Sequence, residues 1–129
     1  MLRSNRYSLL FFCTFLLSGT VVSSAYATVY TSNGNGKWEN ASTWTPAGGP
    51  PGPGDNVVVA SGHTVTTNSN QKSVSSLTVR GGGTVEGESA GDDVNIKAWG
   101  DINNSGTIKT KDGTNPAGSS GNINLEGDD

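Results

Sequence analysis

The chain has 129 residues, a single cysteine, 19 glycines and a formal net charge of −3. Acidic residues outnumber basic ones, which argues against a nucleic-acid partner, because such proteins need clustered lysine and arginine to displace phosphate counterions. The same balance argues against binding to an anionic membrane surface. Abundant glycine, asparagine and threonine favour strands and tight turns over helices.

Residues 1–27 have the features of a cleavable secretory signal. Two arginines lie near the start, residues 9–22 form an apolar run, and a small-residue A-x-A pattern ends at Ala27. The run is shorter than the ~20 apolar residues of a membrane helix, so a retained anchor is the less favoured alternative. We therefore expect signal cleavage after Ala27 and a secreted or cell-surface chain without a membrane span that starts at Thr28.

The segment 28–56 is expected to form an irregular N-terminal cap. Residues 28–31 are compatible with a short strand, and a turn cluster then leads to the paired tryptophans Trp38 and Trp44. The stretch 46–55 is rich in proline and glycine and cannot supply a regular ladder of backbone hydrogen bonds. It is therefore expected to be a surface loop.

From residue 57 onward, short alternating apolar segments are separated by glycine bends. A six-residue step with a glycine inside it joins Val59 to Val65, Val79 to Val85, Ile96 to Ile102, and Ile102 to Ile108. The anchors of successive units are 20 residues apart from Val59 to Val79, 17 from Val79 to Ile96, and 29 from Ile96 to Leu125.

This pattern predicts an all-β fold in which residues 57–129 form the coils of a right-handed parallel β-helix, or solenoid, with inward Val, Ile and Leu stacked between coils. An antiparallel β-sandwich is the alternative, since its strands also alternate. The six-residue step is difficult to fit to hairpins and favours the solenoid. The last unit ends within its repeat, so we expect a C-terminally truncated piece of a longer protein. The alternative is a complete small domain whose acidic C-terminal residues protect the edge of the last coil.

Two groups of motifs resemble known families. The sequence Trp38-x5-Trp44, then the segments 53–59, 62–66 and 76–79, resembles the opening of the eight-glycine domain found in large bacterial surface proteins. The segments 96–108 and 121–125 resemble the repeats of filamentous-haemagglutinin-type adhesins. Together they cover about residues 36–125. The resemblance implies a secreted β-helical protein that acts in adhesion or in contact with polysaccharide.

We accordingly expect an exported structural or interaction module, part of a cell-surface adhesin or of a polysaccharide-contacting β-helix protein. The alternative is the non-catalytic portion of a secreted polysaccharide lyase or glycoside hydrolase. No pair of carboxylates or nucleophile with its base is recognisable, so no enzyme activity and no cofactor is expected.

The tryptophans are the candidate carbohydrate contacts. Trp38 and Trp44 form either a platform for a sugar ring or, as we favour, a buried cap over the first coil. Trp99 lies at a corner beside Gly100 and is the better candidate for contact with a polysaccharide or a host or cell-surface glycan.

Metal binding is not expected. His63 is the only histidine, and the chain after residue 27 has no cysteine to complete a zinc site with it, so a turn residue is the favoured reading. A calcium site would form only if stacked corners of the coils brought several aspartates together. We favour the alternative that these aspartates are solvated surface charges. They are Asp92, Asp93, Asp101, Asp112, Asp128 and Asp129.

Overall fold

The structure, a computed structural model, describes residues 26–111 and 121–127. The strands are β1 Val29–Ser32, β2 Gly36–Lys37, β3 Trp44–Thr45, β4 Asn56–Val59, β5 Thr64–Thr67, β6 Lys72–Val74, β7 Ser76–Val79, β8 Thr84–Gly87, β9 Val94–Ala98, β10 Ile102–Asn104, β11 Thr107–Lys109 and β12 Ile123–Glu126, with one 3-10 turn, η1, at Ala41–Thr43. Over these ranges, no helix has the length and apolar character needed to cross a membrane. The predicted signal falls almost entirely on residues outside the described ranges.

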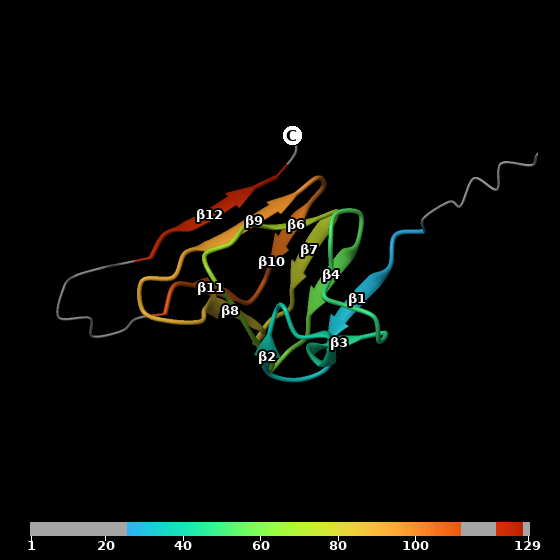
Figure 1. Ribbon diagram of the computed structural model, residues 1–129, viewed down its shortest axis with the longest axis horizontal. Helices are drawn as coiled ribbons and strands as arrows, with labels where there is room; N and C mark the ends of the chain where they lie inside the picture. The colour runs from blue at the N-terminus through green and yellow to red at the C-terminus, as the bar shows by residue number, and fades with distance from the viewer. Residues whose placement is uncertain (1–25, 112–120, 128–129) are drawn as a thin grey trace, which may run out of the picture.

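The strands assemble into three sheets that form the sides of a solenoid (Figure 1). Sheet A has the order β3-β1-β4-β7-β10, sheet B has β2-β5-β8-β11, and sheet C has β6-β9-β12. Each coil takes one strand from each sheet in turn, and about three turns are formed. Every pairing between coils is parallel, which confirms the predicted parallel β-helix and makes the antiparallel sandwich wrong. Within the described ranges, antiparallel pairing occurs between β1 and β3.

The register confirms two of the three predicted coil steps and corrects the other. Val59 pairs with Val79, and Ile96 pairs with Leu125. The 17-residue step from Val79 to Ile96 is wrong, because Val79 pairs with Asn104 and Ile96 lies beside Lys72 in another sheet. The six-residue steps therefore carry the chain around a corner to the next sheet, and they do not separate one coil from the next.

Buried side chains from all three sheets form one core inside the coils. Its members are Tyr30, Trp38, Trp44, Val57, Val59, Val65, Val74, Leu77, Val79, Val85, Val94, Ile96 and Ala98, with Ile102 and Ile108 packed against it. Like residues stack on like, as where Val65 pairs with Val85. Burial of these apolar surfaces is the main stabilising term of the fold.

Glycine is required where the coils turn and approach each other. Gly62 and Gly82 occupy equivalent corners with φ of +78° and +83°, which L side chains rarely adopt, and the Gly62 amide donates to Gly82 O at 3.0 Å. A Cβ at Gly106 would lie 2.6 Å from Arg80 O and 2.8 Å from Val79 Cγ1. The glycine spacing seen in the sequence thus marks corners and close contacts between coils.

The segment 28–56 is more regular than predicted. β1 pairs in parallel with β4, and β2 pairs in parallel with β5, so this segment extends sheet A by β1 and β3 and sheet B by β2. Tyr30 lies in register with Val57 and continues its inward row. No strand is formed between Thr45 and Asn56, which agrees with the predicted proline- and glycine-rich loop.

Candidate functional site

The candidate site lies on the outer face of sheet C and is created by the alternation of β9. Val94, Ile96 and Ala98 point into the core and are almost fully buried. Because successive side chains of a strand point to opposite faces, Asn95 and Lys97 lie on the outer face. Trp99 follows directly after the strand and continues the outward positions.

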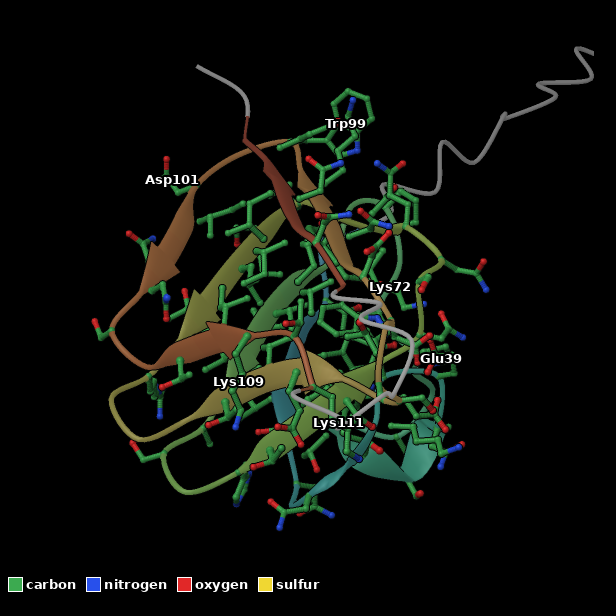
Figure 2. The ribbon with its side chains drawn as sticks, turned by 90° about the vertical axis from the view of Figure 1, so that its left-hand side faces the viewer. Glu39, Lys72, Trp99, Asp101, Lys109 and Lys111 are labelled. Carbon is green, nitrogen blue, oxygen red and sulfur yellow. The ribbon has the colours of Figure 1, made fainter. Side chains whose placement is uncertain are left out.

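Trp99 lies at the corner between β9 and β10 and projects away from the body of the solenoid, at the top of the view in Figure 2. Its side chain is 56% exposed, whereas its backbone is fixed by the neighbouring coil. The Trp99 amide donates to Val74 O at 3.0 Å, and the Gly100 amide donates to Ser75 O at 2.7 Å. The large apolar ring of Trp99 is therefore exposed to solvent on a corner whose backbone is held in place.

Lys97 links the tryptophan to the next coil. Its Nζ lies 4.7 Å from the centroid of the Trp99 ring and 3.3 Å from Glu126 Oε2 on β12. A cation over an indole at an exposed site contributes about 0.5–1 kcal/mol, enough to restrict the ring's orientation. The ammonium covers one face of the indole, so a ligand would stack on the other.

Polar side chains continue this surface away from the tryptophan. Asn95 pairs in register with Asn124, and Lys97 pairs with Glu126 on one side and Ser73 on the other. The Asn95 Nδ2 donates to Ser69 O at 2.7 Å, which holds its amide in place. An exposed indole beside amides and a charged pair can pack against the apolar face of a sugar ring and hydrogen-bond its hydroxyl groups.

Trp38 and Trp44 form the buried cap over the first coil, and not a platform for a sugar ring. They are only 1% and 2% exposed, and their ring centroids lie 5.1 Å apart in an edge-to-face arrangement. The Trp44 Nε1 donates to Trp38 O at 2.8 Å, and Gly49 lies against the Trp44 ring. These side chains close the first coil and present no face to solvent, so Trp99 alone of the three predicted contact residues is available to a sugar.

His63 joins two coils. Its Nδ1 lies 2.9 Å from Ser32 Oγ and 3.0 Å from Ser32 O, and the Ala60 amide donates to the same Ser32 Oγ at 2.8 Å. The histidine thereby ties the end of β1 to the turn between β4 and β5.

The aspartates at the corner between sheets B and C bind the backbone. The Ser89 amide donates to Asp92 Oδ2 at 2.8 Å, and the Asn122 amide donates to Asp93 Oδ1 at 2.6 Å. Across residues 26–111 and 121–127, no three His, Cys, Asp or Glu side chains are grouped to hold a metal ion. Asp101 is exposed, and Asp112, Asp128 and Asp129 lie outside the described residues.

Comparison with known proteins identifies the family. The model of the G8 domain matches residues 38–129, which is most of the chain. The chain belongs to the G8 domain family. No curated protein and no solved structure matches it.

The G8 match confirms the eight-glycine resemblance. The matched residues include Trp38, Trp44 and Trp99. G8 domains are extracellular, so this chain is an exported module. The likeness to haemagglutinin-type repeats, with the adhesin role that it implied, stays a prediction.

The residues around Trp99 were not identified from the sequence of this G8 domain. Asn95 and Lys97 alternate with the inward Val94 and Ile96, and that alternation was sufficient to place them on the outside. The predicted 29-residue step from Ile96 to Leu125 was likewise sufficient to place Asn124 beside Asn95 and Glu126 beside Lys97, although these pairs were not singled out.

Lys72 was also missed. It lies in register with the inward-facing Ile96, and its side chain is only 9% exposed. Its Nζ donates to Asn68 Oδ1 at 2.7 Å and forms an ion pair with Glu39 Oε1 at 2.5 Å; Figure 2 labels the two residues of this ion pair. This lysine fastens the tryptophan cap of the G8 domain to sheet C.

The outer face of sheet B carries charged pairs. Lys37 donates to Glu88, and this hydrogen bond, together with the Glu88 charge, raises the pKa of Lys37 above its ordinary 10.5. Lys109 Nζ lies 3.4 Å from Glu86 Oε2. No aromatic side chain belongs to β2, β5, β8 or β11, so this face lacks the stacking platform found on sheet C.

Proposed function

We propose that this G8 domain is a non-catalytic binding module that contacts polysaccharides or cell-surface glycans through Trp99. The observation that carries the proposal is the exposed indole, fixed on a rigid corner and bordered by Lys97 and Glu126. An adhesin, or another surface protein that contacts polysaccharide, is the kind of protein in which such a module would act.

The chemistry of this surface suits sugars better than it suits proteins or nucleic acids. One large aromatic ring offers an apolar platform, while amide, carboxylate and ammonium groups nearby donate and accept hydrogen bonds. A protein interface normally needs a broader apolar centre, and on this face the other outward residues named above are polar.

Binding without turnover is favoured by the distribution of carboxylates. Hydrolysis of a glycosidic bond requires two carboxyl groups that flank it. Among the outward positions of β6, β9 and β12, Glu126 is the one carboxylate, and it is paired with Lys97.

The proposal is tested with a glycan array probed by the purified secreted chain. We expect selective glycan binding that Trp99→Ala weakens by at least about tenfold, or 1.4 kcal/mol. Val29→Ala is the matched control, because Val29 is 52% exposed but lies on sheet A. Failure of the parent chain to bind any glycan, or unchanged binding by the Trp99 variant, would contradict the proposal.

A further inference from the structure

The outward residues of β9 form a line that is longer than the tryptophan platform alone. Asn95, Lys97 and Trp99 are successive outward positions. At about 3.3 Å per residue, the line from Asn95 to Trp99 is about 13 Å long, which is more than one sugar ring occupies.

The neighbouring strand doubles this line. Asn124 lies opposite Asn95 and Glu126 lies opposite Lys97, so polar groups stand in two parallel rows that run toward the indole. Both residues on β12 are exposed, and Lys97 is partly exposed. We call the five residues Asn95, Lys97, Trp99, Asn124 and Glu126 the β9 track.

The β9 residues of the track are restrained before a ligand arrives. β9 is the central strand of sheet C, between β6 and β12. The Asn95 amide is fixed on Ser69 O, and the Lys97 ammonium is fixed between Glu126 and the indole. Little conformational entropy therefore remains to be lost when a ligand binds.

The charges around the track select against anionic chains. Lys97 is its one cation, and Glu126 lies 3.3 Å from that ammonium. Asp93 precedes β9 by one residue, and Asp101 follows Trp99 by two. A uronate or sulfated polymer would meet more negative than positive charge, whereas a neutral chain would meet no net repulsion.

We infer that the β9 track binds a neutral, linear oligosaccharide along the strand, with several sugar units bound in series. Trp99 stacks on one unit, the Lys97–Glu126 pair hydrogen-bonds the hydroxyl groups of the next, and the two asparagines bind the unit beyond. This inference rests on the proposed function and adds to it the length, direction and charge of the ligand.

The test is a calorimetric titration of the secreted chain with β-1,4-linked gluco-, manno- and xylo-oligosaccharides from mono- to hexasaccharide, and with oligogalacturonates as the anionic counterpart. The variants are Asn95→Ala combined with Asn124→Ala, and Trp99→Ala. Thr84→Ala on sheet B is the control, because its side chain is also polar and outward on a central strand.

We expect affinity for one neutral series to rise at least tenfold from the mono- to the trisaccharide and then to level off. The double asparagine variant should lose this gain but retain binding of the short sugars, and Trp99→Ala should lose binding of all lengths. The Thr84 control should match the parent chain, and the oligogalacturonates should bind more weakly than the neutral series.

Two kinds of failure can be told apart. Binding that depends on Trp99 but not on chain length, a length gain that survives in the double asparagine variant, or tighter binding of oligogalacturonates would overturn the inference and leave the proposed function standing. Absence of binding to every saccharide would overturn both.

Discussion

The two structural roles assigned to tryptophan can be separated by making the same substitution at two positions. Trp44 is 2% exposed inside the cap, and Trp99 is 56% exposed on the corner after β9. Trp44→Ala should therefore lower the free energy of unfolding strongly, and Trp99→Ala should lower it much less.

The expected loss at Trp44 follows from its contacts. Replacing a buried tryptophan with alanine costs about 3–5 kcal/mol. The edge-to-face pair with Trp38 contributes about 0.5–1.5 kcal/mol beyond the buried area. Removal of the indole also leaves Trp38 O without its donor, which costs about 1–3 kcal/mol if the carbonyl stays buried. These contributions overlap and are not additive.

The expected loss at Trp99 is much smaller. Surface substitutions usually change stability by less than about 0.5 kcal/mol, and the contact with Lys97 adds about 0.5–1 kcal/mol. In a domain of this size, whose total stability is about 5–15 kcal/mol, the two variants should differ clearly.

Thermal and urea unfolding followed by far-UV circular dichroism provide the assay. At about 4–8 °C per kcal/mol, Trp44→Ala should lower Tm by more than about 12 °C, and Trp99→Ala by no more than about half of the shift seen for Trp44→Ala. Equal shifts for the two variants, or a larger shift for Trp99→Ala, would refute the assignment of Trp44 to the cap.

Three further predictions concern the contacts between coils, the buried lysine and processing. Gly106→Ala should destabilise the chain by about 1–3 kcal/mol, because its Cβ meets the backbone of the adjacent coil. In the same urea series Gly81→Ala should be neutral or slightly stabilising, because a Cβ there lies 3.8 Å from Ser105 O, an ordinary contact distance. Glu39→Ala should lower the free energy of unfolding by about 1–3 kcal/mol, because the buried Lys72 ammonium loses its carboxylate partner. Lys72→Met should lower it less, because methionine keeps the apolar part of the side chain and removes the charge. Equal losses for the two variants would contradict this reasoning. N-terminal sequencing of the secreted chain should begin at Thr28, whose amide lies 3.3 Å from Asp55 Oδ1, and another first residue would refute cleavage after Ala27.

The strands of sheets A and B could be predicted from the sequence because their apolar residues alternate clearly. Val57 and Val59, and then Leu77 and Val79, mark inward rows that the structure confirms. The six-residue step to Val65 likewise located the next strand. Local periodicity is sufficient for this purpose, because side-chain direction in a strand follows from its pleat.

The first strand of sheet C, β6, could not be recognised in the same way. β6 has Val74 as its single apolar residue, and a lysine occupies its other inward position. The pattern of Lys72-Ser73-Val74 is therefore weak, and β6 was overlooked, although Ile96 and Leu125 marked the later strands β9 and β12 of the same sheet. The error in the 17-residue step follows directly from that omission.

Only part of the candidate site was identified from the sequence. Trp99 was identified from its place beside a corner glycine, but its neighbours on β12 are set by which strand lies next to β9. That pairing is a long-range property of the coil, and it depends on loop lengths that vary from one turn to the next. The predicted step from Ile96 to Leu125 gave the β9–β12 pairing correctly, but the pattern gave no indication that β6 lies on the other side of β9.

The central claim is that the exposed indole of Trp99 is the platform on which a glycan binds. Acrylamide quenching of tryptophan fluorescence tests it directly, because Trp38 and Trp44 are buried and the quencher reaches Trp99. Saturation with the tightest-binding neutral oligosaccharide should reduce quenching to the level seen in the Trp99→Ala variant. Unchanged quenching at a glycan concentration that calorimetry shows to be saturating would contradict the claim and place the sugar elsewhere.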